Sequence, residues 1–138
     1  MPAVNFQAWL DRVGDSFFDA DFATYRDAVL LPLTVATRDE THIVSDEAQL
    51  QQGFTAWIDM MEGAGIDTMI RTSRDVEQLG PELIVGRYET ELLRGGKRMV
   101  EPFASSMQLR LGGDGTWRCF SVASGFGAAS GWPMDRPK

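Results

Sequence analysis

The spacing of apolar residues changes once along this chain, and that change constrains the fold more than any other feature. In three segments before residue 64, apolar side chains recur every three or four positions, which is typical of amphipathic helices. From residue 66 to residue 124 they alternate every second position in long runs, which is typical of strands with one buried face. Helices followed by strands predict an α+β fold with the helices packed on one face of a sheet.

Local signals bound the three helical segments. Asp19 or Asp21 can cap the second helix, which Pro32 is expected to end. Asp46 and Gln49 have the spacing of a reciprocal cap at the start of the third helix. The buried stripes are expected to hold Phe6, Trp9, Leu10, Val13 and Phe17 in the first helix, Phe22, Tyr25 and Val29 in the second, and Leu50, Phe54, Trp57, Ile58 and Met61 in the third.

Six runs have the composition of strands. Two short runs rich in Thr, Val and Ile flank a tight turn at residues 38–40, and four long runs are separated by glycine-containing turns. The long runs predict four consecutive antiparallel strands. The expected strands are residues 33–37, 41–45, 66–76, 83–93, 99–111 and 116–124.

Size and charge limit the number of domains and the class of partner. The chain has 138 residues, which predicts one domain over residues 1–138, with a core at 5–124 and an irregular tail at 125–138. With 13 Lys and Arg against 20 Asp and Glu, the net charge is -7, which disfavours nucleic acids and anionic lipid surfaces as partners. No apolar run is long enough to span a membrane.

Rare residues narrow the chemistry further. Cys119 is the only cysteine and cannot form an internal disulfide, so we expect a cytoplasmic protein. His42 is the only histidine, which leaves too few ligands for a zinc site. The glycines at 112–115 lack the spacing of a phosphate-binding loop. We therefore expect neither a metal nor a cofactor.

The order of elements resembles that of the nuclear transport factor 2-like superfamily, over roughly residues 5–124. Two passages are similar in detail: residues 21–41, where a helix runs into Leu-Thr-Val-Ala, and residues 107–122, where Leu-Arg-Leu-Gly-Gly-Asp-Gly-Thr-Trp-Arg is similar to a closing hairpin. The superfamily includes ketosteroid isomerase, scytalone dehydratase and SnoaL-like cyclases. The resemblance implies a cystatin-like cone, in which a curved, mainly antiparallel sheet packs on the helices and leaves a pocket at its open end.

Glu101 is the foremost candidate for a catalytic residue. The alternation that buries Phe103 and Met107 also points its carboxylate toward the core, where an acid can give or take a proton near neutral pH. The alternative is that Glu101 lies at the solvent-exposed end of its strand, before Pro102, and forms a surface ion pair with an arginine.

Four further residues are candidates for catalytic groups. Tyr88 and Tyr25 are expected on buried faces, where each hydroxyl either binds a ligand or bonds to backbone or water. The resemblance implies that Tyr25 and Glu101 could act as a donor pair, although the position expected to hold the base reads Leu-Pro-Leu-Thr at residues 31–34. It also implies that His42 and Asp27 could form an acid-oriented base, whereas a histidine on a short hairpin is more often solvated.

Two sets of side chains are candidates for ligand contacts. The predicted pocket walls are Trp9, Phe54, Trp57, Phe103, Ser105 and Met107, and the alternative for the helical aromatic residues is ordinary core packing. Arg71 and Arg74 either clamp a ligand carboxylate or pair with Glu89 or Glu91 on the exposed sheet surface. The surface pairing is the favoured interpretation for both.

Two functions from different classes remain open. The first is a pocket protein for a small, apolar, ring-containing molecule, with lyase, isomerase or cyclase chemistry as one form of it. The second is a non-catalytic ligand-binding or interaction domain that acts as a homodimer through the outer face of the sheet. The apolar residues expected on that face are Val100, Ala104, Phe120 and Val122.

Overall fold

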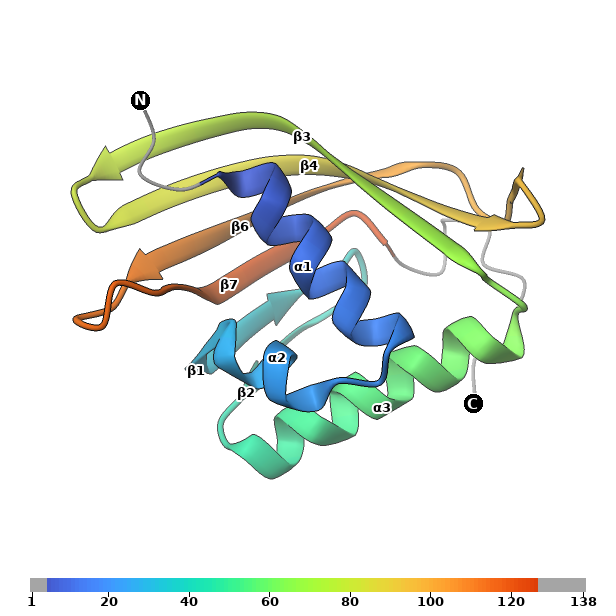
Figure 1. Cartoon of the computed structure of the whole chain (residues 1–138), viewed down its shortest axis with the longest axis horizontal. Helices are drawn as coiled ribbons and strands as arrows, with labels where there is room; N and C mark the ends of the chain where they lie inside the picture. The colour runs from blue at the N-terminus through green and yellow to red at the C-terminus, as the bar shows by residue number, and fades with distance from the viewer. Residues whose placement is uncertain (1–4, 127–138) are drawn as a thin grey trace.

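The computed structural model describes residues 5–126, in which three helices cover one face of a curved sheet (Figure 1). Most of the tail predicted at residues 125–138 lies outside the described residues. Among the described helices, none has the length and hydropathy needed to span a membrane. The elements are α1 (Phe6–Phe18), α2 (Phe22–Asp27), β1 (Val29–Ala36), β2 (Thr41–Val44), α3 (Glu47–Gly63), β3 (Thr68–Gly80), β4 (Leu83–Arg94), β5 (Lys97–Arg98), β6 (Phe103–Leu111) and β7 (Trp117–Ser124).

The strands form one sheet of seven strands, one more than the six predicted. Its path is β2-β1-β7-β6-β4-β3, and the two-residue strand β5 pairs with β4. The four long strands are consecutive antiparallel neighbours, as their alternation predicts. Only β1 and β7 run parallel to each other among the described strands. The sheet is therefore mixed, mainly antiparallel and bent around the helices.

Polar side chains start each helix. Asn5 accepts a hydrogen bond from the Ala8 amide at 3.0 Å, which satisfies one of the free amides at the start of α1. Asp46 accepts from the Gln49 amide at 2.9 Å, and the Gln49 side chain accepts from the Ser45 amide at 2.8 Å. The reciprocal cap predicted for α3 is thus confirmed, with its return bond directed to Ser45.

The junction of α2 and β1 differs from the prediction. The helix ends at Asp27, and Val29, expected on its buried stripe, is already the first residue of β1. The carbonyl of Ala28 accepts a hydrogen bond from the Cys119 amide at 2.8 Å, which draws the chain into the sheet beside β7. Pro32 therefore lies inside a strand, within the shift of register between Val29 and Thr34, where a missing amide is tolerated.

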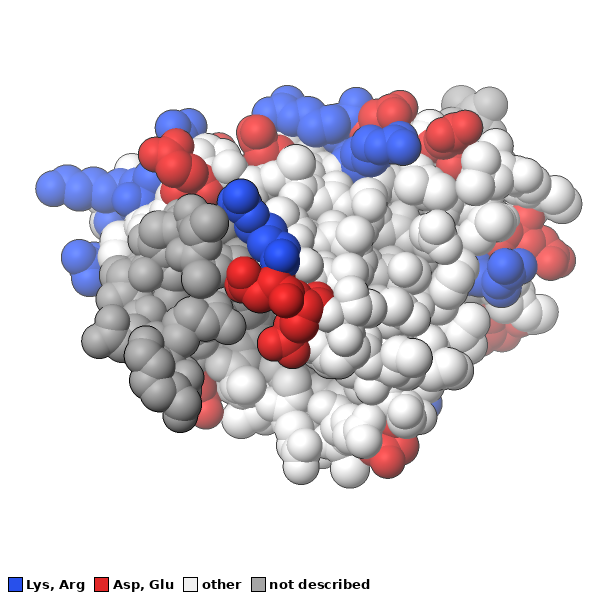
Figure 2. Space-filling model, turned by 180° about the vertical axis from the view of Figure 1, so that it is seen from behind, with Lys and Arg blue, Asp and Glu red and all other residues white. Residues whose placement is uncertain are grey.

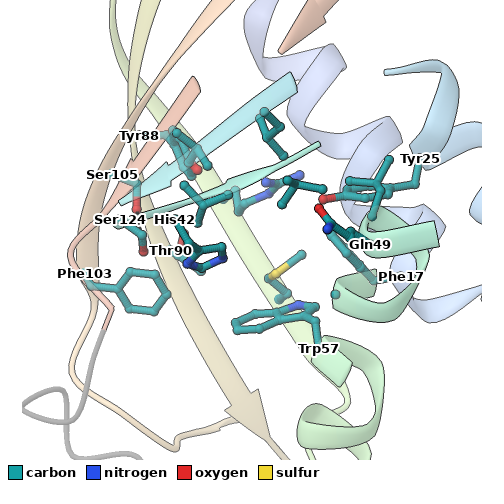
Figure 3. A pocket seen from close by; sticks show the side chains of 18 residues that line it. Phe17, Tyr25, His42, Gln49, Trp57, Tyr88, Thr90, Phe103, Ser105 and Ser124 are labelled. Atoms are coloured by element: carbon teal, nitrogen blue, oxygen red, sulfur yellow. Dashed lines mark hydrogen bonds between the residues drawn. The ribbon is translucent and has the colours of Figure 1, made fainter. Parts of the chain in front are cut away.

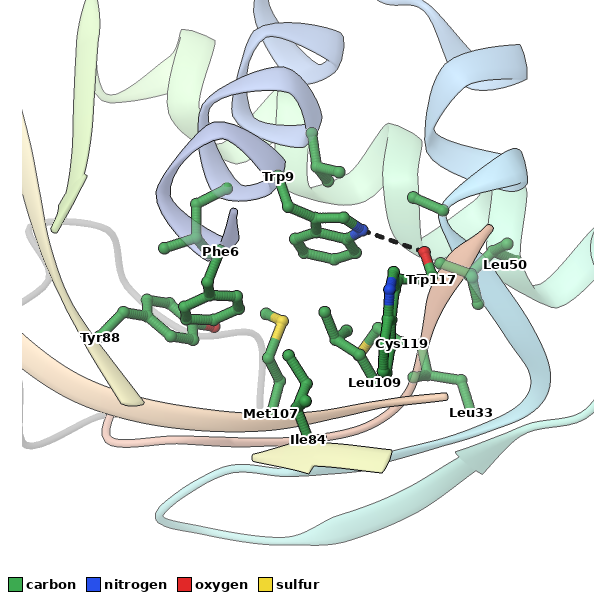
Figure 4. Packing of buried hydrophobic residues seen from close by; sticks show 14 residues of the cluster. Phe6, Trp9, Leu33, Leu50, Ile84, Tyr88, Met107, Leu109, Trp117 and Cys119 are labelled. Atoms are coloured by element: carbon green, nitrogen blue, oxygen red, sulfur yellow. Dashed lines mark hydrogen bonds between the residues drawn. The ribbon is translucent and has the colours of Figure 1, made fainter. Parts of the chain in front are cut away.

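The main core lies between α1 and the sheet. Trp9 is 6 % exposed, and its indole nitrogen donates a hydrogen bond to the carbonyl of Trp117 at 3.1 Å (Figure 4). The Phe6 ring lies directly over Gly86 of β4, where a Cβ atom would come within 2.4 Å of the ring. This close approach seats the start of α1 on the middle of the sheet.

The outer face of the sheet is less apolar than its alternation predicts. The register of β6 and β7 shifts between Gln108 and Leu109, so that Val122 faces inward. Val100 is 5 % exposed in a second buried cluster, which leaves Ala104 and Phe120 of the four predicted residues. Figure 2 shows this side of the molecule, with a broad area free of Lys, Arg, Asp and Glu. The homodimer stays a prediction.

Candidate functional site

A cavity of about 310 Å³ lies between the sheet and the helices. Every helix and every strand except β5 contributes to its walls. The exposed residues His42 and Gly53 mark where the cavity meets solvent. Figure 3 shows its labelled polar and aromatic side chains facing one another across the cavity: Tyr88, Thr90, Phe103, Ser105 and Ser124 from the sheet, and Phe17, Tyr25, Gln49 and Trp57 from the helices.

The structure divides the predicted site residues into two groups. Six of them line the cavity and five lie elsewhere. The lining residues are Tyr25, His42, Trp57, Tyr88, Phe103 and Ser105, and the residues outside it are Trp9, Asp27, Phe54, Glu101 and Met107.

Glu101 does not face the cavity. It is exposed, in the irregular residues 99–102 between β5 and β6. Strand alternation is correct from Phe103 onward, where Ser105 and Met107 are buried, but the regular strand begins two residues after Glu101. The prediction that alternation points this carboxylate inward is therefore wrong, because Glu101 is exposed and is not part of a regular strand.

His42 and Asp27 do not form a pair. Asp27 lies at the end of α2, where it accepts a hydrogen bond from the Arg118 guanidinium at 3.2 Å. His42 lies on β2 at the mouth of the cavity, with its Nδ1 atom 3.8 Å from a carboxylate oxygen of Glu40. The acid-oriented base that the resemblance implies is absent, because Arg118 holds the acid in question.

Three predicted ligand contacts belong to the core instead. Trp9 and Met107 are 6 % and 5 % exposed in the cluster beneath α1. Phe54 is 4 % exposed and lies behind the cavity wall, with its ring centroid 4.9 Å from that of Tyr25. The alternative interpretation, ordinary core packing, is therefore the correct one for Trp9 and Phe54.

The two tyrosines of the cavity are hydrogen-bond donors and not bases. Burial raises the pKa of Tyr25 to about 12. Burial also raises the pKa of Tyr88, and the positive charge of Arg71 opposes this rise only in part. The thiol of Cys119 behaves in the same way, because burial raises its pKa to about 12. All three groups are neutral near pH 7.

For Arg71 the favoured interpretation, pairing with Glu89 or Glu91 on the sheet surface, is wrong, because its side chain lines the cavity. Its Nη2 atom donates a hydrogen bond to the carbonyl of Leu10 at 2.7 Å, and its guanidinium carbon lies 5.7 Å from the centre of the Tyr88 ring. Arg74, by contrast, forms the predicted surface ion pair with Glu89 at 2.8 Å. Arg74 is exposed and falls within the shift of register between Ser73 and Asp75, whereas Arg71 lies in the regular part of β3 before that shift and lines the cavity.

The charges around the cavity are of one sign. Among the described residues that line it there is no Asp or Glu, and the basic side chains are Arg71 and His42. The part of the chain from residue 5 to residue 126 also holds no group of three or more His, Cys, Asp or Glu suited to a metal ion. The walls can donate hydrogen bonds to a ligand and attract negative charge, and they offer His42 as the single imidazole base.

Comparison with known proteins identifies the fold. No protein-family model and no curated protein matches this sequence. An NTF-2 like protein of unknown function from Shewanella oneidensis is 11 % identical, with a TM-score of 0.71 over 91 % of this chain and 100 % of that one. A cystatin-like fold protein of unknown function from Nostoc punctiforme is 14 % identical, with a TM-score of 0.70 over 93 % of this chain and 91 % of that one.

A ketosteroid isomerase-like protein from Erwinia carotovora is also similar. It is 14 % identical, with a TM-score of 0.60 over 86 % of this chain and 90 % of that one. Likeness at such identities concerns the fold and not the chemistry of the site. The chain therefore has an α+β cone fold, like these NTF-2 like and cystatin-like proteins.

Proposed function

We propose that this protein binds a small, apolar, ring-containing molecule in the cavity between its sheet and its helices. The cavity volume of about 310 Å³ carries the proposal, together with walls that are mostly apolar and hold a few convergent donors. Sites for small molecules have volumes of about 300–1,000 Å³ and this same composition. Trp57 and Phe103 supply flat surfaces for a ring, and the hydroxyls of Tyr25 and Ser105 supply polar contacts.

Binding without proton abstraction is the form of this function that the residues support best. The names of several solved neighbours refer to ketosteroid isomerase. An isomerase that moves a proton between carbon atoms needs a base in contact with its substrate. In the described lining, no carboxylate can take that role, and His42 is exposed at the mouth. We therefore place binding ahead of isomerase chemistry.

A neutral two-ring compound tests this proposal. We expect 2-naphthol to bind the wild-type protein with a dissociation constant on the order of 100 μM, as measured by isothermal titration calorimetry. Gly53→Phe should weaken this binding by about tenfold or more, because the new ring occupies the mouth of the cavity. An added Cβ at Gly53 meets no atom within 4 Å, and phenylalanine suits a helix better than glycine does, so the variant should fold.

Glu101→Gln is the matched control for this measurement. It removes the carboxylate that lies outside the cavity, so the affinity for 2-naphthol should equal that of the wild type. A wild-type protein that shows no saturable binding, or a Gly53→Phe variant that binds as tightly as the wild type, contradicts the proposal.

A further inference from the structure

Three arginines of the described residues are not exposed, Arg26, Arg71 and Arg118, and of these Arg71 alone forms no ion pair with a carboxylate. Carboxylates also pair with exposed arginines at the protein surface, namely Arg74, Arg87 and Arg98. No ion pair forms at Arg71 within residues 5–126, although its side chain extends into the interior. A charge removed from water without a partner is unfavourable, so something else is expected to compensate it.

The bonding capacity of this guanidinium is only partly used. Nη2 donates to the carbonyl of Leu10, but the Nε atom is buried and has no hydrogen-bond partner among the described residues. Buried donors are nearly always satisfied, so this group is an exception. Because the Nε atom is closed to a water-sized group, the donors left for a ligand oxygen are the remaining N–H groups on Nη1 and Nη2.

The surroundings hold Arg71 in place without neutralising it. The Tyr88 ring lies beneath the guanidinium at 5.7 Å, an attraction that leaves the charge intact. Gly14 of α1 packs against the side chain, and a Cβ there would lie in ordinary contact, 3.5 Å from Nη2 and 3.4 Å from the methyl carbon of Met69. Tyr25 and Cys119, which also interact with this charge, are neutral near pH 7. The cavity therefore has an uncompensated positive wall.

Acidic residues do lie on the far side of Arg71. It also borders a smaller cavity of about 110 Å³ that Asp11 and Asp15 of α1 help to line. Both aspartates are exposed, and the Asp11 carboxylate accepts a hydrogen bond from Gln7 at 3.0 Å. Water screens such exposed carboxylates, so they neutralise the guanidinium only weakly.

From these observations we infer that the natural ligand is a monocarboxylate with an apolar ring system, and that Arg71 binds its carboxylate. This inference rests on the proposed function and specifies the chemical class of its ligand. A planar carboxylate matches the fork of a guanidinium and accepts two of its N–H groups at once. A single arginine in a mostly apolar cavity suits one negative charge better than the two of a phosphate ester.

A pair of nearly isosteric probes tests the inference at pH 7.5. We expect the wild-type protein to bind 2-naphthoate about tenfold or more tightly than 2-naphthamide, as measured by isothermal titration calorimetry. Arg71→Met should abolish this preference. It should weaken the binding of 2-naphthoate and leave the dissociation constant of 2-naphthamide within about threefold of the wild-type value, because methionine keeps the apolar bulk. Arg71→Lys should retain part of the preference, since it keeps the charge and loses the fork. Arg74→Met is the matched control at an exposed position and should retain all of it.

The outcomes separate the inference from the function on which it rests. Equal binding of the two probes to the wild type overturns the carboxylate inference and leaves small-molecule binding intact. If the Arg71→Met variant still prefers 2-naphthoate over 2-naphthamide, another group binds the carboxylate, and this result also overturns the inference. Failure of 2-naphthol, 2-naphthamide and 2-naphthoate alike to bind overturns both proposals. The comparison of the probes on the wild type needs no variant to fold.

Discussion

Trp9→Ala should lower the free energy of unfolding by about 3–5 kcal/mol, the range for removing a large buried aromatic side chain. Trp9 is 6 % exposed, its ring centroid lies 6.3 Å from that of Phe6, and its N–H group bonds to the carbonyl of Trp117. The substitution removes this contact area and leaves a cavity between α1 and the sheet. Urea denaturation followed by circular dichroism measures the loss.

Two companion variants separate core packing from ligand contact. Trp9→Phe keeps a ring but leaves the Trp117 carbonyl without its donor, for which we expect a loss of about 1–3 kcal/mol. Trp57→Ala removes a half-buried side chain from the wall of the main cavity, so it should weaken binding of 2-naphthol more than it lowers stability. If Trp9→Ala denatures at the same urea concentration as the wild type, the assignment of Trp9 to the core is wrong.

Gly86→Ala should lower the free energy of unfolding by about 1–3 kcal/mol, the range for overfilling a packed core. The new methyl group would lie 2.4 Å from the Phe6 ring, which is itself 3 % exposed and cannot simply turn into solvent. The start of α1 must move away from β4 to accommodate it. Thermal denaturation monitored by circular dichroism measures the effect.

A control and a double variant make this result specific. Gly80→Ala adds the same methyl group at the end of β3, where it meets no atom within 4 Å, so stability should hardly change. Phe6→Leu combined with Gly86→Ala should cost less than the sum of the two single changes, because the smaller side chain relieves the overlap. Strict additivity in this cycle contradicts the contact between Phe6 and Gly86.

The fold was predictable because each signal that determines it is local or periodic. The cap at Asp46 and the alternation in β6 both have the form that the sequence indicates. The end of α2 was not predictable in this way, because the bond between Ala28 and Cys119 joins segments far apart in the chain. Position 122 was also mispredicted, since its orientation follows from a shift of register in β7 that no local pattern announces.

The candidate site was only partly predictable, for a related reason. Alternation places Tyr88 and Ser105 correctly, because each lies well inside a regular strand. The alternation rule fails for Glu101. This residue precedes the first residue of β6, so it does not belong to either face of a strand. Arg71 was predictable in principle, but an inward arginine without an acidic partner contradicts the general preference of charges for the surface. Such departures are expected where a chain binds something.

Methyl and indole NMR signals test the central claim, that the cavity between sheet and helices is the binding site. Met69 lines the cavity and Met107 lies in the core beneath α1, so their methyl groups report on the two locations separately. On titration with 2-naphthol, we expect the Met69 methyl and Trp57 indole signals to shift with one common dissociation constant, while the Met107 methyl signal shifts little. Saturable binding that leaves Met69 and Trp57 unchanged would contradict it.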